Sequence, residues 1–260
     1  MISMEGCVDI TKVSLREISK KVAKDIIIKN HYTHKWSLCR IAYGIFYKTD
    51  VKSDFLGENE ENLVGVVVYG QCAGRSAARS ICNQIKLTEV LELTRLWIED
   101  LPQCKNIESY CISQSIKLIK RDFPQIKCIL SYADASAGHL GGIYKACNFI
   151  FQGCGEIALM SNYSISLSGP PNEYKWEHSR TVSSRYGSHN VEHLKKSIRR
   201  TFYRKKESNK YRYVLFISNK SENKKFIKNL KHPSLPYVKN LNHVEEIEKI
   251  EVKENNDFFE

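Results

Sequence analysis

The sequence is poor in the features that mark several classes of protein. It has 13 glycines and 6 prolines in 260 residues, which excludes a collagen-like or low-complexity chain. Its nine cysteines include no Cys-x-x-Cys pair, so the spacing typical of zinc fingers is missing from the sequence. No apolar run approaches the length of a membrane span, and the first residues lack the apolar segment of a secretory signal. These absences predict a cytoplasmic protein.

The cysteines that are there lie mostly in apolar stretches. A reduced cysteine in such a place behaves as a small hydrophobic residue. Together with the odd count, this predicts a reducing compartment without a disulfide framework.

Positive charge is concentrated in one part of the chain. The whole sequence has 40 Lys and Arg against 29 Asp and Glu, and 18 of the former against 4 of the latter lie between Lys175 and Lys239. Such a block indicates a phosphate-rich partner, because each cation that neutralises a phosphate releases condensed counterions. A solvated basic face is the alternative. From Glu245 onward the sign reverses, with seven acidic residues and two lysines, which predicts a disordered tail.

Hydrophobic periodicity predicts a mixed α/β fold. Ser14 and Glu17 have the spacing of a capping box before a helix. The predicted elements are a helix over 14–29, strands over 38–47, 63–69 and 90–98, a helix from Asn106 to before Pro124, a strand over 126–132, a helix over 139–147, and strands over 149–151 and 210–218. Residues 70–83 are predicted to be a loop. The strand–helix–strand segment 90–132 is expected to give two parallel strands in an otherwise largely antiparallel sheet.

A proline-rich segment after Ser168 marks a domain boundary. We therefore expect a core over 1–168, a basic portion over 169–240 and an acidic tail over 241–260.

The densest group of reactive side chains lies between residues 131 and 153. Asp134 follows a predicted buried strand and can act as a base, a metal ligand or a helix cap. Tyr144, on the next helix, can exchange a proton near that strand end, or it can be a core tyrosine bonded to the backbone. Gly141 and Gly142 weaken the helix in which they lie, which indicates a close approach to its backbone.

A second group, Asn30–Trp36, follows the first predicted helix. His31 and Tyr32 lie there among other aromatic and basic side chains, a composition that suits stacking on a nucleobase. Compensation of the helix dipole by His and Lys is the alternative.

A third group begins in the predicted strand over 90–98. Strict alternation places Leu93, Arg95 and Trp97 on one face, and an arginine among apolar neighbours is expected to pair with a carboxylate, a phosphate or a ligand carbonyl. The helix that opens at Asn106–Ser109 offers free N–H groups to an anion such as a pyrophosphate.

A strand, an anion-binding helix start, a second strand and a helix with a tyrosine resemble the GNAT acyltransferase fold, in which the pyrophosphate of acyl-CoA docks at that helix start. The chain departs from that pattern at Leu101–Lys105, where the fold family has a glycine-rich loop. More specifically, the chain resembles the Mom family of bacteriophage DNA-modification proteins over roughly residues 25–240. The segments that carry this resemblance are NHYTHKW (30–36), ELTRLW (92–97), 106–109, SYADASAGHLGGIYKACNFIFQG (131–153) and EHSRTVSSRYG (177–187).

The resemblance implies a GNAT-like catalytic core that converts adenine N6 in DNA to N6-carbamoylmethyladenine, which protects phage DNA from restriction. It also implies acetyl-CoA and iron as cofactors. The matching positions are His31, Tyr32, Asp134 and Tyr144 for the reaction centre and the metal, and Arg95, Asn106 and Ser109 for acyl-CoA. In the alternative without a metal, Tyr144 protonates the departing thiolate and Asp134 orients the N6 amine.

The implied target atom lies inside a duplex, so the base must leave the stack, and Tyr32, Trp36 or Trp97 would then stack on it. Basic side chains would hold the phosphates and set register. They are Arg180, Arg185, Lys195, Lys196, Arg199, Arg200, Arg204, Lys205 and Lys206. The oligomeric state stays open, with a homodimer as one alternative.

Two other functions also stay open. One is an N-acyltransferase that uses acetyl-CoA on a small-molecule or hypermodified-base amine. The other is a non-catalytic nucleic-acid-binding protein.

Overall fold

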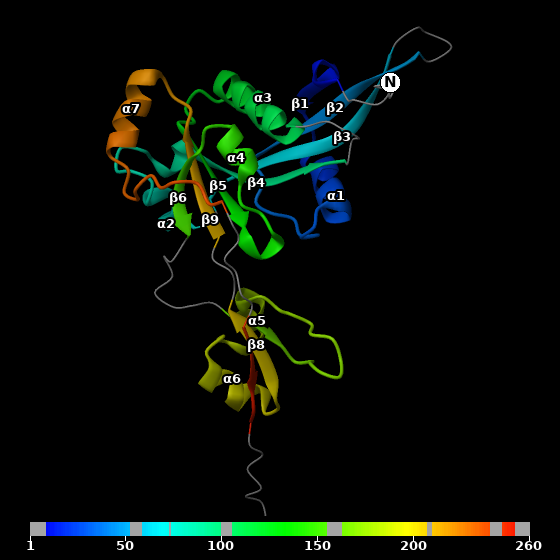
Figure 1. Cartoon of the computed structure of the whole chain (residues 1–260), viewed down its shortest axis with the longest axis vertical. Coiled ribbons are helices and arrows are strands. Elements are labelled where there is room, and N and C mark those ends of the chain that lie inside the picture. The colour runs from blue at the N-terminus through cyan, green and yellow to red at the C-terminus, as the bar shows by residue number, and fades with distance from the viewer. Residues whose placement is uncertain are drawn as a thin grey trace, which may run out of the picture. The chain divides into compact units, whose positions relative to one another are not determined.

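The computed structural model describes residues 9–52, 59–72, 74–99, 106–154, 163–206, 210–239 and 246–252. The chain divides into two compact units (Figure 1). Unit 1 comprises residues 1–133, 139–153 and 211–238, and unit 2 comprises residues 134–138, 154–210 and 239–260. The predicted division at residue 168 differs from this one, because β9, which belongs to the basic portion of the sequence, completes the sheet of unit 1.

A seven-stranded sheet forms the centre of unit 1. Its strand order is β1-β2-β3-β4-β5-β9-β6, with β1 Val13–Glu17, β2 Ile41–Lys52, β3 Asn59–Gly70, β4 Val90–Ile98, β5 Cys128–Asp134, β9 Lys210–Phe216 and β6 Ile150–Cys154. The pairs β1/β2, β2/β3 and β3/β4 are antiparallel, and β4/β5 is parallel. The predicted α/β class with a mixed, largely antiparallel sheet is therefore confirmed.

Helices cover both faces of this sheet, because successive side chains of a strand point to opposite faces. On one face lie α3 Ile107–Asp122 and α4 Gly142–Ala146, which pack on a core that includes Tyr69 and Ile129. On the other lie α1 Lys20–Asn30, α2 Arg75–Arg79 and α7 Lys220–Lys228, which pack on two smaller apolar clusters. Within the described residues, no helix is both long enough and apolar enough to span a bilayer.

The apolar stripe predicted for the helix after Asn106 is the buried face of α3. Ile112, Ile116 and Ile119 are at most 8% exposed. Burial of an isoleucine side chain contributes about 1.5–3 kcal/mol, so this stripe fixes the helix that joins β4 to β5.

The first predicted helix begins too early. Val13–Glu17 forms β1, which pairs with β2, and the helix starts only at Lys20. Ser19 caps it by accepting a hydrogen bond from the Val22 N–H at 3.3 Å, whereas the Ser14 hydroxyl donates to Glu61. Pairing of Val13–Glu17 with β2 therefore determines the structure of this segment, although its local sequence has a capping pattern. The predicted loop over 70–83 also differs, since it contains α2.

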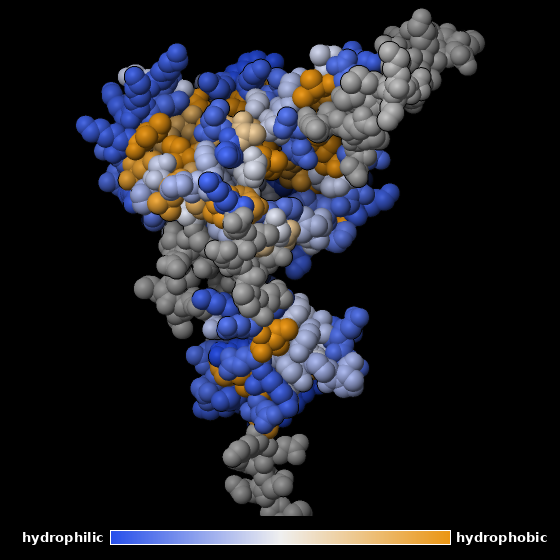
Figure 2. All heavy atoms as spheres, in the orientation of Figure 1, coloured by the Kyte–Doolittle hydropathy of each residue, from blue (hydrophilic) through white to orange (hydrophobic). Residues whose placement is uncertain are grey.

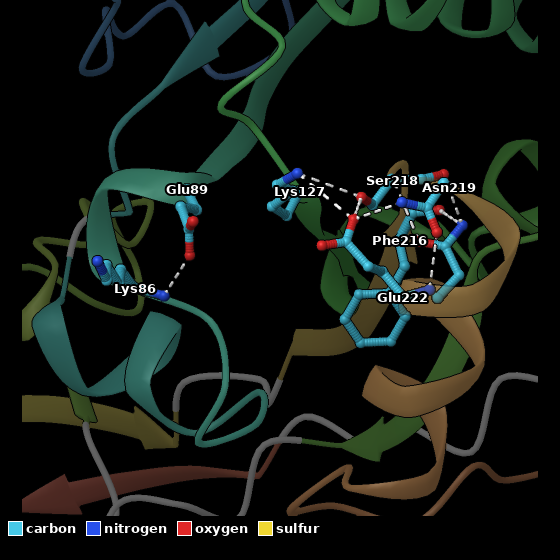
Figure 3. A network of polar contacts seen from close by, with 8 residues as sticks. Lys86, Glu89, Lys127, Phe216, Ser218, Asn219 and Glu222 are labelled. Atoms are coloured by element: carbon cyan, nitrogen blue, oxygen red, sulfur yellow. Dashed lines mark hydrogen bonds and ion pairs between the residues drawn. The ribbon is translucent and has the colours of Figure 1, made fainter.

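The first turn of α7 is joined to the start of β5 by a polar network (Figure 3). The Asn219 side chain accepts from the Glu222 N–H at 2.9 Å, and Lys127 Nζ lies 3.4 Å from Glu222 Oε2. The Ser218 hydroxyl donates to the same carboxylate. This network fixes the end of the sheet opposite to that at which β5 ends.

Unit 2 contains a three-stranded antiparallel sheet and two helices. The strand order is β10-β8-β7, with β7 Tyr163–Ser166, β8 Phe202–Lys206 and β10 Ile247–Ile250. The helices α5 Ser179–Tyr186 and α6 Val191–Ile198 pack on one face of it, around Ile165, Leu194 and Phe202. The predicted disordered tail therefore differs in part, since Ile247–Ile250 pairs with β8. Residues 253–260 lie outside the described residues.

Candidate active site

The site is built where β4 and β5 stop pairing. Their parallel register runs from Val90 and Cys128 to Leu93 and Ser131. The Ser131 hydroxyl donates to the Leu93 carbonyl at 3.1 Å, which joins the last pair of residues in this register. Both strands continue beyond this step, where they no longer pair with each other.

Tyr144 lies beside this point on α4, as the sequence predicts. It is 8% exposed, and its hydroxyl donates to the Tyr132 carbonyl at 3.5 Å. Burial raises the pKa of Tyr144 to about 12, although a hydrogen bond with Ser131 opposes the shift. The phenol is therefore neutral near pH 7 and can donate a proton but cannot serve as a ready base.

Three aromatic rings from two distant segments meet in unit 1. The ring of His31, the residue that ends α1, stacks on Tyr32 with centroids 4.4 Å apart and planes 29° apart. The ring of Tyr32 in turn contacts His139, at 5.2 Å between centroids. Tyr32 is 55% exposed, so its phenol presents a flat surface to solvent between two imidazoles. The sequence leaves His139 open between a reactive group and a surface residue of the helix predicted over 139–147. The helix begins only at Gly142, so His139 precedes it, and its contact with Tyr32 was not predicted.

His31 is held neutral in one tautomer. Burial lowers the pKa of His31 to about 4, and the charges of Arg95 and His139 act in the same direction. The Thr33 backbone N–H points at His31 Nδ1 at 3.1 Å. A backbone N–H can only donate, so Nδ1 must be the acceptor and the proton of the neutral ring lies on Nε2. His31 therefore offers a hydrogen-bond donor from a neutral ring.

The prediction that Leu93, Arg95 and Trp97 share one face is wrong for Leu93. In the β3/β4 register Tyr69 pairs with Leu93 and Val68 pairs with Arg95, so Thr94 forms a bulge. The bulge reverses the alternation, and Arg95 and Trp97 lie on the α1 face while Leu93 lies on the α3 face. An extra residue in one strand is not visible in an alternating pattern.

The bulge directs the Arg95 guanidinium toward the segment that follows α1. Its Nε donates to the Lys35 carbonyl at 3.2 Å, and Nη1 donates to the Thr94 carbonyl at 2.6 Å. Both acceptors are backbone oxygens of the chain itself, so the predicted pairing with a carboxylate, a phosphate or a ligand carbonyl stays a prediction. The charge remains near His31, whose protonation it opposes.

Glu92 is a carboxylate that the sequence motifs did not indicate as reactive. It is partly buried on β4, and its negative charge raises the pKa of both Tyr132 and Tyr144. It therefore lies close to the end of the β4/β5 pairing. Its position as the one acidic residue within the segment 90–98 was the available signal.

Asp134 is the last residue of β5, at the strand end where the sequence places it. Residues 134–138 belong to unit 2, and there the Asp134 carboxylate lies 4.0 Å from Lys210 Nζ. Its approach to His31, Tyr32 and Tyr144 stays a prediction.

The start of α3 carries no side-chain cap. Asn106 adopts a left-handed conformation with φ 66°, and its side chain does not cap the helix. The Ser109 hydroxyl donates to the Asn106 carbonyl at 2.9 Å, which leaves its oxygen able to accept. The amides of this turn therefore have no described side-chain acceptor. Residues 101–105, where the sequence lacks the glycine-rich loop of the GNAT fold, lie outside the described residues.

Comparisons with known proteins now identify the family. Residues 12–239 match the model of the Mom protein family. The chain belongs to this family. The methylcarbamoylase mom of Escherichia phage Mu is 26% identical over 213 residues, which cover 81% of this chain and 78% of the phage protein. The resemblance of the sequence motifs to the Mom family is thus confirmed.

Acetyltransferases are among the solved structures that match. Spermidine N-acetyltransferase from Vibrio cholerae, in complex with CoA and spermine, covers 83% of this chain and 98% of its own, at 10% identity and a TM-score of 0.39. IAA acetyltransferase from Bacillus cereus covers 78% and 99%, at 9% identity and a TM-score of 0.40.

The basic side chains assigned to DNA in this Mom-family chain fall into two sets. Ion pairs join Arg185 to Glu177 at 2.7 Å, Lys195 to Glu192 at 2.9 Å and Arg204 to Glu248 at 2.6 Å. Within the described part of unit 2, no ion pair involves Arg180, Lys196, Arg199 or Arg200. The surface of unit 2 is predominantly hydrophilic in Figure 2.

Iron, which resemblance to the Mom family implied, is not supported by the residues that the structure describes. Among the residues that the structure describes, no three His, Cys, Asp or Glu side chains form a group that could hold a metal ion. No step of the proposed reaction passes through iron.

Proposed function

We propose that this chain is a transferase that modifies adenine at N6 in double-stranded DNA, giving N6-carbamoylmethyladenine, and that it protects phage DNA from restriction. Membership of a family that includes the phage Mu methylcarbamoylase supports the reaction class. The observation that carries the proposal is the exposed Tyr32 ring between His31 and His139, beside Arg95 and the end of the β4/β5 pairing.

The geometry suits an adenine that has left the duplex. The Tyr32 ring is a stacking surface, and base–aromatic stacking contributes about 1–3 kcal/mol per base. Trp36 and Trp97, the other rings considered, pack instead against the apolar cluster under α1. His31 stays neutral beside this surface and keeps a hydrogen-bond donor at Nε2.

The roles of the remaining residues follow from their protonation and position. Tyr144 keeps its proton at neutral pH and can pass it to a leaving group. Asp134, as a carboxylate, accepts a hydrogen bond from the N6 amine and orients it. Arg95 fixes the segment that carries Tyr32 through the Lys35 carbonyl.

Acyl-CoA, as acetyl-CoA, is the proposed donor. The uncapped amides at the start of α3 fit its pyrophosphate, because free N–H groups and the helix dipole both favour an anion. Asn106 and Ser109 line this turn. The bound donor would supply the two carbons of the added group, with CoA thiol as the leaving group. The amide nitrogen, and the two-electron oxidation that joins the methyl carbon to N6, require a nitrogen donor and an oxidant other than acetyl-CoA.

The test is mass spectrometry of nucleosides from the DNA of cells that express the wild-type chain, Asp134→Ala or Tyr144→Phe. We expect deoxyadenosine heavier by one carbamoylmethyl group in the wild type and none with Asp134→Ala. For Tyr144→Phe we expect a reduction of about 10²–10⁴-fold in the initial rate, as for loss of a proton donor.

Tyr47→Phe is the matched control, since it removes a phenol from β2 of the same sheet. Equal soluble yield and melting temperature must accompany any loss. Unmodified adenine in cells with abundant folded wild-type protein would contradict the proposal. Turnover of acetyl-CoA with a soluble amine would then establish the acyltransferase alternative, and salt-dependent DNA binding alone would establish the non-catalytic one.

A further inference from the structure

The two faces of the small sheet in unit 2 have different compositions. Phe202 packs in the core under α5 and α6, and Arg204 lies on that same face with its guanidinium 4.4 Å from the Tyr163 ring. Alternation places Tyr203 and Lys205 on the opposite face. The register sets Tyr203 beside Ser166 and Lys205 beside Ser164, so this face of β7 and β8 carries short polar residues next to one ring and one cation.

The segment that follows β7 returns over this second face and is fixed there. The Lys175 N–H donates to the buried Ser166 hydroxyl at 2.9 Å and to the Ser168 hydroxyl at 3.2 Å. The Ser168 hydroxyl donates in turn to the Glu173 carbonyl at 2.8 Å. A Cβ at Gly169 would lie 2.4 Å from the Tyr203 ring, so only glycine lets the backbone approach that ring so closely.

This segment brings two more rings to Tyr203. Tyr174 and Trp176 stack at 5.0 Å with planes 22° apart, and Tyr174 meets Tyr203 edge-on at 5.2 Å. Lys205 Nζ lies 4.9 Å from the centroid of the Trp176 ring. We define Tyr174, Trp176, Tyr203 and Lys205 as the aromatic–basic face.

The rings of the aromatic–basic face do not belong to the apolar core. Tyr163 and Tyr186 pack against that core, whereas Tyr174, Trp176 and Tyr203 lie outside it and stay partly exposed. These three rings are partly exposed beside a lysine, so they contribute less hydrophobic stabilisation than rings buried in the core would. Their surroundings carry net positive charge, because residues 163–206 contain ten Lys and Arg against three Glu.

We propose that the aromatic–basic face binds an unpaired base of the DNA, at a place separate from the site that takes the adenine. This proposal rests on the proposed function, since removal of a base from a duplex leaves its partner unpaired. Rings beside cations are the chemistry that binds single strands, where stacking tolerates any base and the cations attract the adjoining phosphates. An apolar protein partner would not require the surrounding positive charge.

The experiment measures binding of the full chain to two DNA duplexes of one sequence, one fully paired and one with a single unpaired thymine. We expect the wild type to prefer the second duplex, and Trp176→Ala to reduce that preference roughly 10-fold, the typical effect of removing a stacking ring. Trp176→Phe keeps a ring, so it should retain most of the preference while losing the quenching of tryptophan emission that stacking produces in the wild type.

Salt dependence separates stacking from charge. Trp176→Ala should leave the slope of log K against log salt unchanged, because an indole neutralises no phosphate. A wild type without preference, or a preference unchanged in Trp176→Ala, would overturn the proposal. If Trp176→Ala fails to fold, Trp176→Phe provides the test. If DNA binding leaves the tryptophan emission of the wild type unquenched, as in Trp176→Phe, the proposal is overturned.

Nucleoside masses from the same proteins distinguish the two proposals. Modified adenine without a preference for the unpaired base leaves the function standing and refutes the aromatic–basic face. A preference for the unpaired base without modified adenine supports binding at the aromatic–basic face and refutes the proposed function.

Discussion

His31 illustrates at the scale of one residue how the surroundings fix a protonation state. Burial, the charge of Arg95 and the Thr33 N–H at Nδ1 all oppose a proton on that nitrogen. The consequence is a neutral donor beside Tyr32 across the physiological pH range. This state cannot be read from the sequence, where His31 is simply one of two histidines in a polar segment.

We predict that His31 titrates with a midpoint near pH 4 in ¹H–¹⁵N NMR spectra that resolve its imidazole nitrogens. A folded-state pKa below the ordinary value of 6.5 means that the unfolded chain binds the proton first. The contribution of His31 to the free energy of unfolding is therefore present above pH 6.5 and decreases as the pH falls from 6.5 toward 4.

The variant His31→Gln checks the assignment. It should lose this part of the pH dependence in chemical unfolding measured between pH 4 and 7, while the remaining dependence stays. A His31 midpoint near 6.5 would contradict both the neutral state and the donor role that follows from it.

At the scale of single elements, α4 shows how one glycine positions a reactive group. Gly141 precedes the helix with φ +75°, and a Cβ there would lie 2.4 Å from the Tyr213 ring, whose hydroxyl donates to the Leu140 carbonyl. Gly142 has no atom within 4 Å of such a Cβ. The close approach that the pair of glycines predicted is therefore real at Gly141 only.

We predict that Gly141→Ala lowers the free energy of unfolding by about 1–3 kcal/mol, through backbone strain and the clash with Tyr213. It should also reduce adenine modification, because Tyr144 lies one turn away. Gly142→Ala is the matched control and should be neutral or stabilise by up to about 1 kcal/mol. Urea unfolding of the two variants decides, and equal losses would show that the Tyr213 contact is unimportant.

Elements with strong periodicity could be predicted, and those set by pairing could not. The bounds of β4 were predicted to the residue, and the parallel crossover through α3 is confirmed. Val13–Glu17 has a capping pattern that suits a helix, yet it pairs with β2. The bulge at Thr94, which turns Arg95 to the α1 face, depends on the register with β3 and leaves no local mark.

For the whole molecule, the motifs indicated most residues of the candidate site, which stays a prediction, but not how they come together. His31, Tyr32, Arg95 and Tyr144 were predicted, and the structure brings them together around the end of the β4/β5 pairing. The contact of His139 with Tyr32 was not predicted and Glu92 was missed, because a histidine after a glycine and a glutamate in a strand have no distinctive spacing. The division into units was also beyond the sequence, since the chain leaves unit 1 after β6 and returns to it at β9.

The basic residues of unit 2 give a prediction at this largest scale. Free cations release counterions when they reach phosphates, and cations already paired with a glutamate contribute less. We predict that replacing Arg180, Lys196 and Arg200 together by Gln reduces the slope of log K against log salt by up to about 0.9 for each phosphate that these cations neutralise. The matched set consists of Arg185, Lys195 and Arg204, each in an ion pair.

Replacement of this matched set by Gln changes the net charge equally, so it isolates the effect of pairing. Its slope should stay much closer to that of the wild type. Fluorescence anisotropy with one duplex over a range of salt concentrations measures both sets, and melting curves confirm that unit 2 stays folded. Equal changes in the two slopes would show that DNA senses only the total charge of unit 2, and that the ion pairs open whenever a phosphate approaches.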